Sequence, residues 1–269
     1  MRAVHRISRV CLIWVLLALT PLVTHATDFD RLTVISYHEI EEPSRALIPG
    51  YAVSPTMFVR HIDWLRNNGF VFVSVDQVLS ARSGGVPLPP KAVLLTFDDG
   101  YTSVYQHAWP LLKMLKIPSV ISVVTSWQES AGYVDYDGKP VPRDRFLSWE
   151  ALREMHSTGL VEIASHTHDL HHGLKANPQG SAQPAATARG FDQLRGYEAE
   201  TDYLKRIDAD LRLSRDLIRK RTGSAPRIVT WPYGKYNEMV ESTASKYGMN
   251  VGLTLDDGDN HSGVPLSRL

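Results

Sequence analysis

The chain has 269 residues, of which 43% are hydrophobic and 22% charged, and its 29 Lys and Arg balance its 29 Asp and Glu. These are the values of an ordinary globular protein, with room for one large domain or two small ones. The absence of net positive charge argues against a nucleic-acid-binding protein, and a single Cys excludes an internal disulfide framework.

The N-terminus has the features of a secretory signal peptide. Basic residues precede an apolar stretch over residues 10–22, and Thr24-His25-Ala26 matches a small-residue cleavage site. A membrane anchor is disfavoured because the apolar stretch is shorter than the roughly 20 residues that a span needs. Cleavage after residue 26 would remove three of the 29 Lys and Arg but no acid, leaving 26 against 29 and a net charge of −3. It would also remove Cys11, so the mature domain (residues 27–269) would have no Cys metal ligand or nucleophile.

Apolar segments of strand length alternate with amphipathic segments of helix length along the rest of the chain. This alternation predicts an α/β fold with a parallel sheet and outer helices. About seven such units fit an incomplete (β/α) barrel, and a doubly wound open sheet is the alternative. No Gly-rich dinucleotide fingerprint or phosphate loop is present. We expect strands at residues 32–37, 70–75, 91–95, 119–125, 161–164, 228–230 and 251–255, and helices at 54–69, 76–81, 103–116, 148–159, 199–221 and 237–247.

Three segments do not follow this alternation. Residues 133–145 are polar and aromatic, and we expect them to cross over the top of the fold. Residues 173–200 are rich in Gly, Ala, Pro, Gln and Asn and form a long surface insertion that could act as a lid. After the strand at 251–255 no helix is predicted, so we expect apolar surface to be left exposed at that edge of the sheet.

Two adjacent carboxylates follow the apolar strand at residues 91–95. Asp98 and Asp99 precede Gly100, which lets the backbone turn. Burying adjacent acids is costly without a cation or hydrogen bonds, and α/β proteins build sites at the carboxyl ends of parallel strands. Because neighbours in an extended chain point to opposite sides, we expect different functions for the two aspartates. Taken alone, this segment fits a solvated Asp-Asp-Gly turn equally well.

Four of the nine histidines in the mature chain lie within seven residues, directly after the strand at 161–164: His166, His168, His171 and His172. Such a cluster at a strand end favours metal binding over a structural role. Two imidazoles and one carboxylate, with open positions, form the pattern of a catalytic divalent-metal site. Asp98 or Asp99 would supply the carboxylate, and spacing alone does not show which two histidines bind.

Two further features end strands at the same rim. Trp231-Pro232-Tyr233-Gly234 follows the strand at 228–230, and its aromatic rings could form a stacking wall for a sugar. The alternative, a Pro-Tyr-Gly turn beside a core Trp, fits equally well. His38 ends the first strand, although rim histidines are more often simply hydrogen-bonded than functional.

Two other classes of hydrolase fit the sequence poorly. A glycosidase needs two carboxylates at least about 5 Å apart, flanking the scissile bond, which adjacent aspartates at one strand end do not provide. A serine hydrolase with a Gly-x-Ser-x-Gly elbow is disfavoured because the sequence lacks that motif.

The Thr-Phe-Asp-Asp-Gly element at residues 96–100, the histidine cluster and the Trp-Pro-Tyr-Gly element together resemble the polysaccharide deacetylase superfamily (NodB homology, carbohydrate esterase family 4). More narrowly, the chain is similar to the N-terminal deacetylase domain of the periplasmic poly-β-1,6-N-acetyl-D-glucosamine deacetylases of biofilm export systems. The resemblance covers essentially all of the mature chain, and the closer match is carried by residues 36–40, 165–173, 176–180 and 231–234.

The resemblance implies a role for each residue of this constellation. Asp99, His166 and His171 would bind a divalent cation, which could be zinc, nickel, cobalt or iron. The two histidines are five residues apart here, whereas many superfamily members space them by four. Asp98 would be the general base and His38 the general acid, in a subfamily whose acid precedes the Asp-Asp motif because the barrel is circularly permuted.

The resemblance also places the Trp-Pro-Tyr-Gly element at the substrate. Trp231 and Tyr233 would contact the sugar, and the backbone N–H of Tyr233 would help to hold the oxyanion. Many members carry an Arg two residues before the motif Pro, where this chain has Thr230. Asp98 would therefore lack its usual orienting partner, and the sequence suggests no substitute.

The implied function is metal-dependent N-deacetylation of an acetylated glucosamine polymer, poly-β-1,6-N-acetyl-D-glucosamine, in the periplasm. An outer-membrane export protein would be a potential partner. Biofilm members usually continue into a second, C-terminal domain, so we expect residues 27–269 to be the deacetylase part of a longer protein. Two other interpretations stay open: a deacetylase of chitooligosaccharide, peptidoglycan or acetylxylan, and a non-catalytic polysaccharide-binding module, against which the complete Asp and His set argues.

Overall fold

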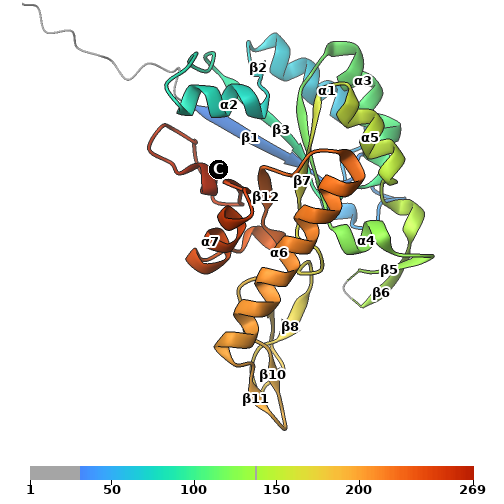
Figure 1. Cartoon of the computed structure of the whole chain (residues 1–269). Helices are drawn as coiled ribbons and strands as arrows, with labels where there is room; N and C mark the ends of the chain where they lie inside the picture. Colours follow the sequence, from blue (N-terminus) through green and yellow to red (C-terminus); the bar gives the residue numbers. More distant parts are fainter. Residues whose placement is uncertain (1–30, 137) are drawn as a thin grey trace, which may run out of the picture.

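The computed structural model describes residues 31–136 and 138–269 (Figure 1). The expected signal peptide at residues 1–26 lies outside the described residues. Strands and helices alternate as predicted. Their bounds are β1 Leu32–Tyr37, α1 Pro55–Asn67, β2 Val71–Phe72, α2 Val75–Arg82, β3 Ala92–Phe97, α3 Trp109–Leu115, β4 Ser119–Val123, α4 Thr125–Glu129, β5 Tyr133–Tyr136, β6 Lys139–Pro142, α5 Trp149–Ser157, β7 Val161–Ser165, β8 Gly173–Lys175, β9 Ala182–Pro184, β10 Phe191–Asp192, β11 Gly196–Tyr197, α6 Glu200–Thr222, β12 Ile228–Thr230, α7 Glu238–Lys246 and β13 Val251–Leu253.

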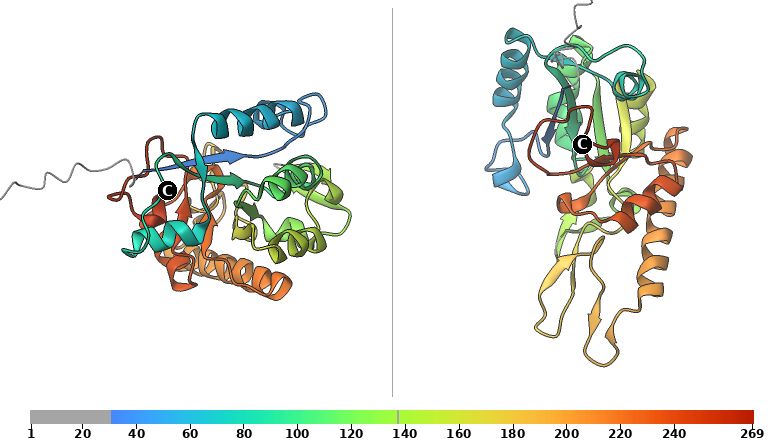
Figure 2. Two further views of the ribbon diagram at one scale, coloured as in Figure 1. Left: turned by 90° about the horizontal axis from the view of Figure 1, so that it is seen from above. Right: turned by 90° about the vertical axis from the view of Figure 1, so that its left-hand side faces the viewer.

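Seven strands form one sheet in the order β1-β3-β4-β7-β12-β13, with β2 also paired to β3. All of these pairings are parallel. Apart from β2, the strand order follows the chain without the reversal that marks a doubly wound sheet. The sheet curls into a half-barrel with helices around it (Figure 2). The predicted incomplete (β/α) barrel is therefore confirmed.

Strand residues alternate between two hydrophobic clusters because both faces of the parallel sheet are covered. In β3, Leu95 and Phe97 pack with residues of α1, α3 and α5. Leu94 belongs to the cluster on the opposite face, which includes residues of α2. At the carboxyl ends of the strands the apolar residues give way to buried polar ones, among them Asp99 and His166. The core thus fixes the rim on which the candidate site is built.

The strand expected over residues 119–125 ends at Val123, and α4, which was not predicted, begins at Thr125. Two other predicted elements differ from the structure for physical reasons. The helix expected over residues 103–116 is split into a π-helical turn, Val104–Ala108, and α3. Pro110 has no N–H to donate to the preceding turn, so the regular hydrogen-bond ladder cannot run through it. The strand expected over residues 70–75 is limited to β2, because Ser74 is the N-cap of a capping box that begins α2.

The two irregular segments form hairpins. Residues 173–200 contain the antiparallel pairs β8–β9 and β10–β11, which extend beyond one end of the sheet beside the first turns of α6 (Figures 1 and 2). Residues 133–145 contain the hairpin β5–β6. Within the described residues, no helix is both long and apolar enough to cross a membrane.

The edge of the sheet at β13 is covered, which corrects the expectation of exposed apolar surface there. The N–H of Leu269 donates to the carbonyl of Gly252, and the N–H of Thr254 donates to the carbonyl of Leu269. The Leu269 side chain is only 4% exposed. A Cβ at Gly252 would lie 2.0 Å from the carbonyl oxygen of Ser267, so this close approach requires glycine.

Candidate metal centre

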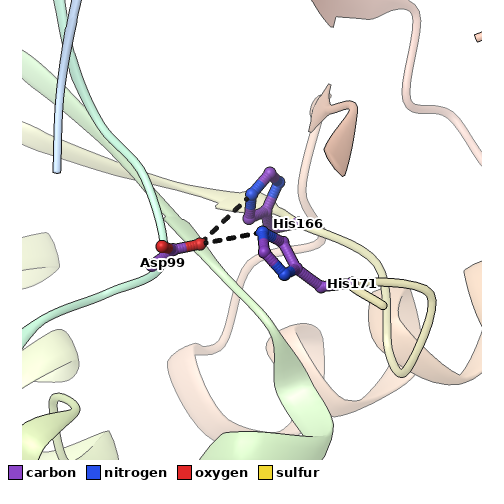
Figure 3. A group of neighbouring side chains, drawn as sticks. All are labelled: Asp99, His166 and His171. Atoms are coloured by element: carbon purple, nitrogen blue, oxygen red, sulfur yellow. Dashed lines mark ion pairs between the residues drawn. The ribbon is translucent and has the colours of Figure 1, made fainter. Parts of the chain in front are cut away.

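Three potential metal ligands from two strand ends converge on one point (Figure 3). Asp99 follows β3, His166 follows β7 directly, and His171 comes five residues later. The Nε2 atoms of His166 and His171 lie 3.4 and 3.3 Å from Oδ1 of Asp99. Each residue offers a ligand atom within 4.8 Å of the other two, so one cation could be held between them.

The turn after β3 directs the two aspartates to different partners. The N–H of Asp98 donates to the carbonyl of Tyr37 at 2.8 Å and so continues the pairing with β1. Asp99 has a left-handed φ of 67°, and Gly100 has one of 68°. A Cβ at Gly100 would lie 2.9 Å from a methyl carbon of Val123, so both conformation and space require glycine there.

The surroundings of His166 aim its Nε2 at Asp99. Its Nδ1 donates to the carbonyl oxygen of Thr230 at 2.7 Å, which leaves Nε2 facing the carboxylate. Burial lowers the pKa of His166, but its close contact with Asp99 and the charges of Asp98 and Asp99 raise it more, to above its usual value. Burial raises the pKa of Asp99, but His171 and His166 hold it well below its usual range.

Asp98 meets a different partner from Asp99. It is 5% exposed, and its Oδ2 accepts a 2.8 Å hydrogen bond from the hydroxyl of Ser36 on the neighbouring β1. The hydroxyl of Thr230 lies 2.7 Å from that of Ser122 instead. Many family members orient this Asp with an Arg at the position of Thr230, and here the hydroxyl of Ser36 orients Asp98 instead. A single serine in a strand gave no signal for this role in the sequence.

His38 lies at the end of β1, as expected. Its ring stacks on Tyr51, with centroids 5.3 Å apart and planes 21° apart. Burial raises the pKa of Asp99, whereas His171 and His166 lower it. The charge of His38 lowers this pKa further. His38 is thus part of the electrostatic surroundings of Asp99, with one face of its ring covered by Tyr51.

The aromatic wall expected from Trp231 and Tyr233 is not formed by both rings. Trp231 is 2% exposed and packs in a core cluster with Leu170 and Tyr203, so it offers no open face to a sugar. The structure thus corrects the expectation for Trp231 and favours the alternative, a core Trp. Tyr233 is 37% exposed, and its ring centroid lies 4.8 Å from that of His171. Of the pair, Tyr233 is the residue that a substrate could contact.

Two buried tyrosines extend the network behind Asp99. The hydroxyl of Tyr101 donates to that of Tyr136 at 3.2 Å, and the hydroxyl of Tyr136 lies 3.4 Å from Oδ2 of Asp99. The residue types around Tyr136 show only a polar and aromatic segment. Its contact with Asp99 depends on how the β5–β6 hairpin folds back over the rim.

A family model for polysaccharide deacetylases matches residues 85–252. The chain belongs to the polysaccharide deacetylase family. The family resemblance inferred from the motifs is therefore confirmed. The matched range includes Asp98, Asp99, His166 and His171 but begins after β1, so Ser36 and His38 of this polysaccharide deacetylase lie outside it.

Individual polysaccharide deacetylases are similar over most of the chain. The poly-β-1,6-N-acetyl-D-glucosamine N-deacetylase of Escherichia coli K12 is 36% identical over 233 residues, which are 85% of this chain and 34% of the relative. The chain thus spans about a third of that relative's length. The deacetylase domain of BpsB from Bordetella bronchiseptica is 40% identical with a TM-score of 0.81, covering 90% of this chain and 94% of its own. A de-N-acetylase from Aggregatibacter actinomycetemcomitans is 35% identical with a TM-score of 0.83, covering 89% and 93%.

Proposed function

We propose that this chain is a metal-dependent N-deacetylase that hydrolyses acetamide groups of poly-β-1,6-N-acetyl-D-glucosamine. The observation that carries the proposal is the convergence of Asp99, His166 and His171, together with the separately oriented carboxylate of Asp98, which directly precedes Asp99. Family membership supports the class of reaction. The name of the E. coli relative supports the choice of polymer.

The proposed metal ligands are Asp99, His166 and His171. They fit a divalent cation because Oδ1 of Asp99 is buried, accepts no hydrogen bond of good geometry from the described residues, and faces two imidazole nitrogens. Nitrogen and oxygen donors of this kind suit zinc, nickel, cobalt or iron. When bound, the cation would supply Lewis-acid polarisation of the acetamide carbonyl and of the attacking water.

The proton transfers are assigned to Asp98 and His38. Asp98, oriented by Ser36, takes a proton from the water as it attacks the carbonyl carbon. The backbone N–H of Tyr233 donates to the developing oxyanion. Protonated His38 gives its proton to the amine nitrogen as the C–N bond breaks, which yields acetate and a free glucosamine residue. An amide needs this protonation far more than an ester does, so His38 matters most for the proposed substrate.

Acetate release from poly-N-acetylglucosamine, measured with and without a chelator, tests the proposal. We expect release that the chelator abolishes and an added divalent cation restores. Faster release from chitooligosaccharide, peptidoglycan or acetylxylan would contradict the choice of polymer but not the reaction class. A protein that binds no metal and releases no acetate from any of these glycans would instead be a polysaccharide-binding module.

We further propose that residues 1–26 are a cleaved signal peptide and that the enzyme works in the periplasm. The support is the pattern of basic residues, apolar stretch and small-residue site. The periplasm is also where the enzyme could meet a polymer in transit and an outer-membrane export protein. Mass spectrometry of the protein from cell fractions should find an N-terminus at Thr27 in the periplasm. An uncleaved chain starting at Met1 in the membrane fraction would contradict the proposal.

A further inference from the structure

Side chains bind every backbone N–H group of the loop that joins the two candidate metal histidines. This loop runs from Thr167 to Leu170, and each of its four backbone N–H groups donates to a side-chain oxygen. The acceptors are Ser165 Oγ for Thr167 at 3.0 Å, Asp210 Oδ1 for His168 at 2.8 Å, Asp210 Oδ2 for Asp169 at 2.7 Å, and Thr167 Oγ1 for Leu170 at 3.1 Å.

Asp210 is the residue that reaches this loop from elsewhere in the fold. It lies on α6, 42 positions after His168, and is 8% exposed. Both of its carboxylate oxygens are used, one for each of two consecutive N–H groups. One turn further along α6, the hydroxyl of Ser214 lies 2.7 Å from that of Ser165, which in turn accepts from the loop. The helix therefore contacts the loop at two successive turns.

The two adjacent N–H groups explain why an acid, and not an amide, stands at this position. Burial raises the pKa of Asp210 to about 6, which shows that its charged form is disfavoured there. An Asn of the same size would avoid that cost, but it has one acceptor oxygen, and its NH₂ group would face the second N–H. Two adjacent donors need two acceptor oxygens in a fixed plane, which a carboxylate provides.

The loop also has a conformation that needs support. Thr167, directly after His166, has a φ of 70°, a left-handed conformation that is unfavourable for a non-glycine residue. Without contacts from outside, the loop would relax from it, and His171 would move relative to His166, which Val123 and Thr230 hold in place. The carbonyl groups of Thr167 and His168 also accept from the N–H groups of Thr125 and Ser126 at the start of α4. Asp210 acts on the other side of the same two peptides.

We propose that Asp210 is a positioning residue of the metal centre, which fixes the His168–Asp169 backbone so that His166 and His171 face one cation together with Asp99. The inference rests on the proposed function only in taking these three residues as metal ligands. Both carboxylate oxygens of Asp210 accept from the backbone between the two histidines, so it acts through that backbone.

Metal affinity of the variant Asp210→Asn tests this role. Apo-protein would be titrated with Zn²⁺ against a competing chelator, and Co²⁺ absorption would report the ligand geometry. We expect the dissociation constant to rise about 10–100-fold, as is typical when a group that orients a metal ligand is lost, with an altered Co²⁺ spectrum. Asp208→Asn is the matched control, because Asp208 lies on the same helix and pairs with Lys246 on the surface. It should leave both readouts unchanged.

A merely structural Asp210 would give a different result. Asp210→Asn would then unfold at a lower temperature but bind Zn²⁺ as tightly as wild type when measured well below that temperature, and this outcome would overturn the proposal. If the variant does not fold, amide hydrogen exchange of the wild-type apo-protein tests whether Asp210 holds the two N–H groups of the loop. The N–H groups of His168 and Asp169 should exchange as slowly as those of β7, and exchange as fast as at the exposed Gly258 would also overturn it. A wild-type protein that binds no metal would contradict the proposed function itself, whereas equal binding by wild type and Asp210→Asn would contradict only this inference.

Discussion

Replacement of Ser36 by alanine should slow deacetylation without weakening metal binding. The hydroxyl of Ser36 donates to Oδ2 of Asp98 at 2.8 Å, and Oδ1 accepts no hydrogen bond from the described residues. Ser36→Ala thus removes the side-chain contact that orients the proposed general base. The candidate metal ligands keep their own contacts, so we expect the change in the catalytic step.

The expected size of the effect follows from this contact. A hydrogen bond to a charged group contributes about 1.5–3 kcal/mol, and each 1.4 kcal/mol is about tenfold in rate. Asp98 is buried, but Ser36 is exposed, and water can partly replace its hydroxyl. We therefore expect the lower end of that range, a fall of about tenfold in kcat. KM should stay the same, because the hydroxyl binds a protein carboxylate and not the polymer.

The assay is acetate release from an N-acetylglucosamine oligomer at saturating metal, with metal content measured on the same samples. Ser36→Thr keeps a hydroxyl and should recover most of the rate. In the Asp98→Asn background, Ser36→Ala should cost little more, because a residue that acts through Asp98 has no further effect once that carboxylate is gone. The reasoning would be refuted by an undiminished kcat in Ser36→Ala, or by an equal loss in both backgrounds.

Four other variants test the remaining assignments. Asp98→Asn should keep its metal but lose most of its rate, by about 10²–10⁴-fold for a positioned base; loss of metal as well would mean that the aspartates share or exchange roles. Asp99→Ala should lose most metal and activity, and one equivalent of metal with full activity would exclude Asp99 as a ligand. His38→Ala should impair hydrolysis of the acetamide far more than that of an activated aryl acetate, whose leaving group needs no proton; equal losses would point to a structural role. Burial raises the pKa of Asp210 from 3.8 to about 6, so between these values the folded protein keeps a proton that the unfolded chain releases. The stability of the apo-protein relative to Asp210→Asn should therefore fall as pH rises from about 4 to about 6, by on the order of 1–3 kcal/mol in urea titrations, and a flat difference would contradict the raised pKa.

Local patterns were enough to predict most elements of the fold. The helix expected at residues 199–221 is α6, Glu200–Thr222, and the strand expected at 228–230 is β12. The predicted bounds of an element were wrong where one residue interrupted its backbone hydrogen bonding. Pro110 divided one helix, and the capping box at Ser74 shortened a strand, although both signals are present in the sequence. No local pattern predicted that Leu269 would cover the edge of the sheet at β13. That contact depends on where the last residues of the described chain return to the sheet.

The sequence by itself determined the type of chemistry at the rim. Adjacent acids and clustered histidines directly after buried strands are expected to lie close together, because the carboxyl ends of parallel strands lie at one end of a barrel. Only the tertiary structure decided that Ser36 faces Asp98, 62 positions away, and that Asp210 holds the histidine loop from 42 positions away. It also decided that the ring of Trp231 lies in the core. Residue type and spacing show which chemistry is available, whereas the direction of one side chain toward another depends on how neighbouring strands and helices pack.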